Sequence, residues 1–461
     1  MMKRSMIALL LVFALCMGLF SGCGKKEGDE SSSTDEMARR EIVELTMYIP
    51  GTASEDTSEQ QMVNKIKDSI LSEFSGYQDS LERKDVNEVD LRLRVEQKLF
   101  PIGSPENEEV KREILSGQGP DMFYFIGGVV SPFQYESALE DLEPYFDKSD
   151  RVKLEDLQQT VLNAGRIRGK LKTLIYSYNL PVFATTDRLL SESGLENLET
   201  LEFGSLNQTF STPQILGKGE DFLLMSDENS LFAYQPYGIL EMLMMGHCVQ
   251  SYFNYNSRES QIGEQLKACY QDYSALISRE DMQGFDSPID GTGQTIRNDY
   301  EKMQEGSLLF QLQSQTSAID IEGSVPKGFT LTMPGEKGNY AMPMEMLSIC
   351  STASKENQER AFGFLEHLLM EHENGGYAAV QYIPTVNRAR ELRSSNWEKG
   401  KSDLDDWQIW YYDQAENISS CNIFDEYYYT QVFQPIMEDE GKPLEQRVRE
   451  LENRTNLYLK E

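Results

Sequence analysis

Hydrophobic positions in the first part of the chain alternate between two spacings. Residues 42–47 and 91–95 carry apolar side chains in the pattern of strands, whereas residues 62–74 carry them at the three- and four-residue spacing of a helix face. Residues 105–116 repeat the helical spacing behind a Ser-Pro start, and residues 122–125 form an unbroken apolar run. The pattern predicts strand, helix, strand, helix, strand, which is the beginning of an α/β fold with a doubly wound sheet.

The segment around which these elements are organised is residues 117–125. Gly117 is placed to take the left-handed conformation that ends a helix, and Gly119-Pro120 cannot continue the helix. The apolar run that follows is typical of a strand covered on both faces, as in a parallel sheet. Ligands bind beyond the carboxyl ends of such strands, so a site is expected just after Phe125. The connection at residues 75–88 is predicted as a loop, and it is long for this kind of fold.

The N-terminus has the pattern of an export signal. Two basic residues precede an apolar run at residues 6–20, and these 15 residues are too few to span a bilayer of about 30 Å. The run closes on Leu-Phe-Ser-Gly-Cys, which resembles a bacterial lipobox, so residues 1–22 are predicted to be a lipoprotein signal peptide and Cys23 the lipidated residue. Residues 23–39 are rich in Gly, Lys, Glu, Asp and Ser and are expected to form a flexible tether. The alternative is ordinary signal cleavage beside an incidental cysteine.

Length, charge and cysteine content narrow the class of protein. A chain of 461 residues exceeds the roughly 250 to 300 residues at which one core stops growing, so at least two lobes are expected. A formal net charge of −33 argues against a nucleic-acid partner. Apart from Cys16 of the signal peptide and Cys23, four cysteines remain, and none forms a CxxC pair, which argues against zinc and redox chemistry. They either form a disulfide, with Cys248 and Cys269 the pair closest in sequence, or remain buried thiols; the other two are Cys350 and Cys421.

A search for catalytic and metal-binding patterns finds no convincing constellation. His367 and His372 are one residue too far apart for an HxxEH zinc site, and we expect surface histidines on a helix. Residues 286–291 lack the alternating ligands and terminal Glu of a calcium loop. We therefore predict that the protein is not an enzyme and that it uses no metal or cofactor.

Several segments resemble one known family, in the order in which that family carries them. The Gly-x-Gly-Pro-Asp helix end at residues 117–121 resembles that of the family 1 extracellular solute-binding proteins of ABC importers, the group that includes maltose-binding protein. Residues 169–181 resemble the strand by which these proteins cross from the first lobe into the second. Further resemblances lie at residues 230–250, 300–310, 328–335, 347–369 and 383–385, of which the first and fourth resemble helices. The Tyr-Asn-Lys-Asp and Pro-x-Thr-Trp motifs of the family are absent from this chain.

The resemblance implies a two-lobed, periplasmic-binding-protein-like (type II) α/β fold with doubly wound sheets and a hinge of crossing segments. Lobe 1 would comprise residues 40–178 and 338–380, and lobe 2 residues 179–337 and 381–461. Three crossing segments would form the hinge, and ligand bound in the cleft would favour the closed state because only there does it touch both lobes.

Candidate ligand contacts are the polar and aromatic residues at strand ends and crossings. The resemblance places an aromatic ligand contact at Phe125 and a polar one at Asn179, and it places an aromatic-rich helix start in lobe 2. For each aromatic the alternative is core packing, which for Phe125 weighs equally. The predicted contacts are Tyr48, Phe125, Tyr178, Asn179, Tyr237, Tyr340, Glu345 and, more weakly, Trp410 with Trp397.

The resulting hypothesis is an exported solute-binding lipoprotein of an ABC importer, lipid-anchored on the outer face of the cell membrane. It would bind a small solute, most simply a sugar or oligosaccharide, as a monomer, and deliver it to the transmembrane subunits of a permease. Two alternatives remain open. One is an extracellular carbohydrate-active enzyme, which would turn a glycan over. The other is a sensor or adhesin lipoprotein that has lost transport.

Overall fold

The computed structural model describes residues 41–51, 57–83, 89–99, 105–127, 130–219, 221–227, 249–254, 258–260, 262–282, 299–313, 321–332, 337–373 and 382–460. Backbone contacts divide the chain into a small unit, whose described residues are 41–42 and 89–90, and a large unit that holds the rest. The predicted signal peptide, the tether, Cys23, Tyr237 and Cys248 lie outside the described residues. The lobe boundaries given above stay a prediction.

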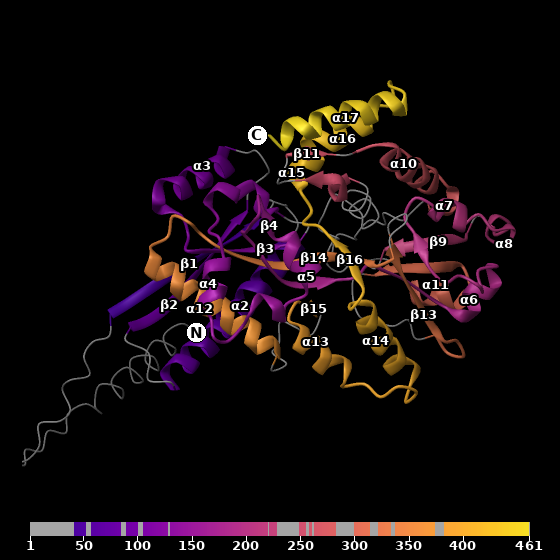
Figure 1. The fold of residues 1–461 in the computed structure, drawn as a ribbon. Helices are drawn as coiled ribbons and strands as arrows, with labels where there is room; N and C mark the ends of the chain where they lie inside the picture. Colours follow the sequence, from indigo (N-terminus) through magenta and orange to yellow (C-terminus); the bar gives the residue numbers. More distant parts are fainter. Residues whose placement is uncertain are drawn as a thin grey trace, which may run out of the picture. The chain divides into compact units, whose positions relative to one another are not determined.

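The described chain consists of strands and helices, and several of them follow another element of the same kind (Figure 1). The strands are β1 (Glu41–Gly51), β2 (Val89–Leu99), β3 (Met122–Ile126), β4 (Arg166–Ile167), β5 (Lys170–Leu171), β6 (Leu174–Asn179), β7 (Val182–Thr186), β8 (Leu201–Glu202), β9 (Leu223–Asp227), β10 (Phe253–Asn254), β11 (Glu259–Ser260), β12 (Leu308–Gln313), β13 (Pro326–Thr332), β14 (Asn339–Ile349), β15 (Ile383–Pro384) and β16 (Ile418–Cys421). The α-helices are α2 (Thr57–Arg83), α3 (Pro105–Glu113), α4 (Glu143–Lys148), α5 (Gln159–Ala164), α6 (Asp187–Glu192), α7 (Leu206–Thr209), α8 (Pro213–Leu216), α10 (Glu264–Ile277), α11 (Asp299–Glu305), α12 (Lys355–Glu373), α13 (Asn387–Ser394), α14 (Asp403–Gln414), α15 (Glu426–Tyr428), α16 (Gln434–Met437) and α17 (Leu444–Tyr458). Every described helix is too short or too polar to cross a membrane.

The long strand β14 organises the main sheet, whose order is β2-β1-β3-β14-β13-β7-β12-β9. All eleven residues of β14 are buried. It pairs antiparallel with β6 from Met342 onward and with β3 from Glu345 onward, whereas residues 339–341 pair with β13 and β16. The strand therefore changes partners along its length and joins the two halves of the sheet, with register irregularities near Tyr340 and Glu345.

The predicted opening run of strands and helices is confirmed, with one correction. β1, β2 and β3 occur where the apolar spacing places them, and β1 pairs parallel with β3. The predicted loop at residues 75–88 is wrong, because α2 continues through Arg83. The helix continues since it packs on α12: Phe74 lies 5.0 Å from Phe364 and Tyr77 lies 5.4 Å from His367, measured between ring centroids. His367 is accordingly buried and not a surface residue.

The segment before β3 has the predicted left-handed glycine, but its last helical turn and the role of Gly119 differ from the prediction. Gly117 has φ 78° and ψ 17°, so the predicted left-handed residue is confirmed, although the last turn, Ile114–Gln118, is a π-helix. Gly119 has φ −76°, a value open to any residue. A Cβ at Gly119 would lie 2.7 Å from the Ile114 Cα, so this glycine is required by close approach. A helix resemblance at residues 347–369 also needs correction, since Leu347 lies in β14 and α12 begins at Lys355.

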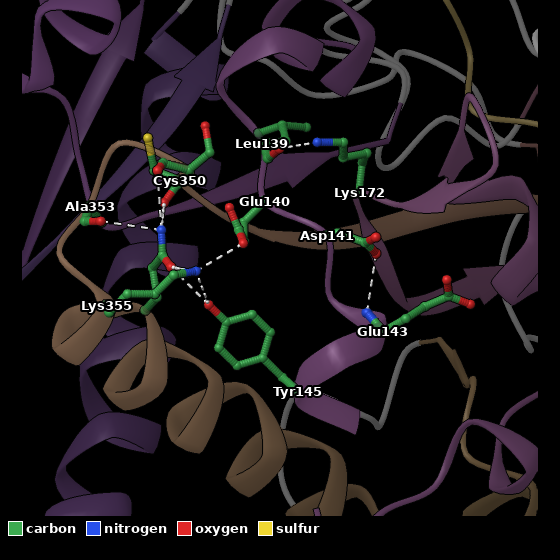
Figure 2. A network of polar contacts seen from close by, with 11 residues as sticks. Leu139, Glu140, Asp141, Glu143, Tyr145, Lys172, Cys350, Ala353 and Lys355 are labelled. Atoms are coloured by element: carbon green, nitrogen blue, oxygen red, sulfur yellow. Dashed lines mark hydrogen bonds and ion pairs between the residues drawn. The ribbon is translucent and has the colours of Figure 1, made fainter. Parts of the chain in front are cut away.

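Polar contacts join the start of α12 to Glu140, which precedes α4, and to Tyr145 within α4. Figure 2 shows the Lys355 ammonium beside Glu140 and Tyr145. The Lys355 Nζ lies 3.1 Å from Glu140 Oε1 and 3.4 Å from the Tyr145 hydroxyl. Behind it, the Gln358 side chain donates to the carbonyls of Cys350 and Ala353. Because the Lys355 side chain is 74% exposed, the ion pair adds little stability.

The last part of the described chain packs as helices. α17 lies against α16 and α10, as Figure 1 shows for the yellow C-terminal helices. Trp407 and Trp410 of α14 cover Gly328 of β13, where a Cβ would lie 2.4 Å from the Trp410 ring.

Cys269, Cys350 and Cys421 are buried free thiols, so of the two alternatives for Cys269 the structure has the thiol and not the disulfide.

Candidate functional site

A small pocket opens at the carboxyl end of β3, where the sequence predicted a site. Its floor is the middle of β14, and one wall is formed by the segment after β16. The lining residues are Gly127, Tyr340, Met342, Pro343, Met346, Asn422 and Phe424. The pocket therefore lies where β14 changes its pairing from β13 and β16 to β3 and β6.

Gly127 allows the end of β3 to approach β14 closely. Its amide donates to the Met344 carbonyl at 2.7 Å. A Cβ on Gly127 would lie 1.9 Å from the Pro343 carbonyl oxygen, a distance that no side chain tolerates. Only glycine lets the two backbones touch here, and their contact fixes the corner of the pocket.

Glu345, a predicted contact, lies on β14 between the two strands that flank it. Its carboxyl accepts hydrogen bonds from the Tyr124 hydroxyl of β3 at 2.5 Å and from the Ser177 hydroxyl of β6 at 2.6 Å. Only 9% of the residue is exposed. Burial raises the pKa of Glu345 above its ordinary value, while the hydrogen bonds from Ser177 and Tyr124 oppose the shift. The three side chains connect β3, β14 and β6 directly beside the pocket.

Tyr340 is the predicted contact that lines the pocket. Its side chain is 4% exposed, and its hydroxyl donates to the Asn422 carbonyl at 3.4 Å. This bond joins β14 to the pocket wall that follows β16. Burial raises the pKa of Tyr340, so the side chain stays a neutral phenol that can donate and accept a hydrogen bond.

The aromatic candidates of β1 and β3 lie within the core. Phe125 is fully buried, and its ring stacks on Phe123 with 5.4 Å between centroids and lies 5.9 Å from Tyr135. Tyr48 is 5% exposed and packs edge-on against Phe123, with the Lys98 ammonium 4.5 Å from its ring centre. Of the two interpretations weighed for Phe125, this geometry favours core packing.

The remaining candidates are distributed around the same strands. Tyr178 and Asn179 end β6 and are fully buried. The Tyr178 hydroxyl has no hydrogen-bond partner among the described residues, and burial raises its pKa. Trp410 lies against β13, away from the lining residues of the pocket, and Trp397 stacks on Tyr412 at 5.5 Å. The structure thus brings Tyr340 to the pocket and Glu345 beside it, and it pairs Asn179 and Tyr178 with the lining residues Met342 and Pro343 of β14. The other described candidates are not among the lining residues, and Tyr237 lies outside the described residues.

Sequence reasoning missed most of the pocket wall. Met342 and Met346 belong to β14, which carries three methionines and one proline, and Asn422 and Phe424 lie in a segment with no motif. The only sequence signal for Asn422 and Phe424 was their place after β16. Their closeness to β14 arises only in the folded protein. The resulting lining is uncharged: thioethers, rings and one amide.

This lining offers apolar contact together with a phenol and an amide, a combination typical of ligand pockets. Among the described residues no group of three or more His, Cys, Asp or Glu side chains is arranged to hold a metal ion.

Comparison with solved structures identifies the fold. The sugar-binding protein MalE from Xanthomonas citri matches 91% of this chain and 98% of its own, with 14% identity and a TM-score of 0.58. The chain has the fold of the family 1 extracellular solute-binding proteins. A member from Alicyclobacillus acidocaldarius covers 91% of this chain and 99% of its own, with 14% identity and a TM-score of 0.50. An ABC-transporter solute-binding protein from Thermotoga lettingae, bound with α-D-tagatose, covers 90% and 99%, with 14% identity and a TM-score of 0.50.

No protein-family model and no curated protein sequence matches the chain. The predicted fold class, α/β and solute-binding-protein-like, is confirmed at the level of the fold. The match with the MalE structure covers nine-tenths of the chain.

Proposed function

We propose that this protein is an extracellular solute-binding lipoprotein of an ABC importer that binds a carbohydrate. The observation that carries the proposal is the pocket at the carboxyl end of β3, at the strand β14 that joins the halves of the sheet, in a chain with the solute-binding fold. Two of the similar structures are named as sugar-binding or sugar-bound. The anchor at Cys23 and delivery to a permease belong to the same proposal and rest on the sequence.

The ligand contacts belong to the proposal as well. Tyr340 supplies a ring and a hydroxyl to the solute, and Asn422 and Phe424 supply the facing wall. Aromatic rings suit sugars because the C–H faces of a pyranose pack on a π surface while its hydroxyls meet amides. Glu345 acts from beside the pocket, where its hydrogen bonds to Tyr124 and Ser177 order the floor.

A thermal-shift screen of the mature protein against mono- and oligosaccharides tests the function. A solute present at 100 times its dissociation constant stabilises the folded state by about 2.7 kcal/mol and raises Tm accordingly. The solute should be recovered chemically unchanged after incubation, which separates binding from turnover. If no carbohydrate of the panel moves Tm, the proposal of a sugar-binding protein is wrong.

A pair of variants then tests the placement of the site. Tyr340→Phe keeps the ring and removes the hydroxyl, and Phe424→Leu reduces the wall without adding a polar group. Both should weaken binding of the solute found in the screen, whereas Trp410→Phe, on the far contact with Gly328, should leave affinity unchanged. Equal affinity of all three variants and the wild type would show that the solute binds elsewhere.

A further inference from the structure

The wall of the pocket continues directly into a buried carboxyl. Asn422 and Phe424 line the pocket, and Asp425, the next residue, is 0% exposed. Phe424 itself is 7% exposed and lies 5.7 Å from the Tyr429 ring, between centroids. Any movement of Asp425 must therefore displace the pocket wall to which it is covalently joined.

Asp425 connects this wall to the C-terminal helix. Its Oδ2 accepts a hydrogen bond from the Tyr458 hydroxyl of α17 at 2.6 Å, and its Oδ1 accepts from the Tyr428 amide of α15 at 3.1 Å. A second bond joins the same helices, between the hydroxyls of Tyr428 and Thr455. On the other side, Gln250 accepts from the Asp425 amide at 3.3 Å and donates to the Ile423 carbonyl at 2.6 Å.

The groups that contact this carboxyl are uncharged at neutral pH. They are the Tyr458 phenol on α17, the Tyr428 amide on α15 and the Tyr427 amide beside it. The next carboxyl along the chain, Glu426, accepts from the Gln134 side chain at 3.4 Å. Among the described residues, the ionised form of Asp425 thus has hydrogen bonds, and no cation, to offset its burial.

We infer that Asp425 is a positioning residue for the solute pocket, because its carboxyl attaches the segment carrying Asn422 and Phe424 to α17. The inference rests on the proposed function in one respect, namely that this pocket is the solute site. The inference gives α17 a role in solute binding, although this helix lies after all of the pocket-lining residues in the sequence.

Burial makes the attachment depend on pH. Removal from water raises the pKa of Asp425 to about 6, against which the hydrogen bonds from Tyr458 and the backbone act. A carboxyl whose pKa is higher in the buried, attached state than in water stabilises the attached state, and this stabilisation is fully present below the ordinary pKa. The stabilisation is lost as the pH rises through about 6. The wall should therefore be held more firmly in mild acid than at neutral pH.

Hydrogen exchange of the full chain tests this without any ligand. Backbone amides of residues 422–428 are compared at about pH 5 and about pH 7 after correction for intrinsic rates, with residues 122–126 of β3 as the internal control. Opening of the wild-type segment should be roughly tenfold rarer at the lower pH, since one pH unit below the buried pKa is worth one factor of ten. In Asp425→Asn, where the side chain stays neutral, the difference should vanish.

Tyr458→Phe supplies the second variant, should Asp425→Asn fail to fold. It removes the donor that favours the carboxylate, so opening should increase at about pH 7 more than at about pH 5. A pH difference that is absent from the wild type, or that persists in Asp425→Asn, overturns the inference. So does an equal effect of Tyr458→Phe at both pH values.

The solute identified by the screen separates this inference from the proposed function. Its dissociation constant should rise with pH through about 6 in the wild type by as much as the fraction of molecules with an attached wall falls, and it should stay flat in Asp425→Asn. If a solute binds with a pH-independent constant and exchange is unchanged by the variants, the attachment is wrong and the proposed function stands. If exchange behaves as expected and no solute binds, the proposed function fails and the attachment to α17 remains.

Discussion

Two glycines two residues apart show how one residue type serves two physical purposes. Gly117 has a positive φ with open space around its Cα, whereas Gly119 has an ordinary φ and a backbone neighbour where its Cβ would be. The first is needed for its torsion angles and the second for its lack of volume. Asn distinguishes the two, because it tolerates the left-handed region but carries a full side chain.

Gly117→Asn should therefore lower the free energy of unfolding by less than about 1 kcal/mol. Gly119→Asn should lower it by roughly 1 to 3 kcal/mol, since the new Cβ must displace Ile114. Chemical denaturation of both variants checks the difference. Equal losses would mean that close approach to Ile114 is not what requires the glycine.

Phe125 is a second case in which burial decides between two roles. With the ring stacked on Phe123 and no exposed area, Phe125→Ala should cost about 3 to 5 kcal/mol of stability. A ligand platform would instead lose affinity and keep its Tm. Tm and the dissociation constant of the solute found by the screen should be measured for Phe125→Ala and, for comparison, for Asn179→Ala. A Phe125→Ala protein with unchanged Tm and weakened binding would show that Phe125 is a ligand contact after all.

At the scale of elements, the Gly-Pro-Asp motif joins three of them. The Asp121 Oδ2 accepts from the Thr46 amide of β1 and its Oδ1 accepts from the Asn357 side chain of α12, both at 2.8 Å. The Asp121 amide also donates to the Thr46 carbonyl, and the Asp121 carbonyl accepts from the Cys350 amide. The motif thus sets the positions of β1, β3 and the start of α12 relative to one another, which explains why an acidic residue directly precedes a buried strand.

Asp121→Ala should consequently destabilise the protein by about 1 to 3 kcal/mol, because the Thr46 amide loses its acceptor. Asn357→Ala removes one bond and leaves the strand pairing intact, so it should cost about 0.5 to 1.5 kcal/mol. Urea denaturation of the two single variants and the double variant measures the coupling. Additive losses would show that the carboxylate does not join β1 to α12.

At the scale of the whole molecule, the proposed lipid anchor predicts where the protein is found. Cys23→Ser would remove the proposed site of lipid attachment, and each buried acyl CH₂ contributes about 0.8 kcal/mol to membrane binding. The variant should leave the detergent phase and be found in the medium or as unprocessed precursor. Unchanged detergent partitioning of Cys23→Ser would remove the anchor from the proposal and leave the solute-binding fold untouched.

The sequence by itself determined the opening strands and helices, the end of the helix at Gly117, and the edge of the sheet where the pocket lies. These are local features, since a hydrophobic period, a glycine torsion angle and a proline act within a few residues. It could not show that α2 passes through Gly76, because Phe364 and His367, almost three hundred residues away, hold that turn. The pocket wall depends on contacts between β14, the loop after β16 and α17, and only the tertiary structure brings Asn422, Phe424 and Asp425 to them, because such contacts carry no signal in the spacing of one chain segment.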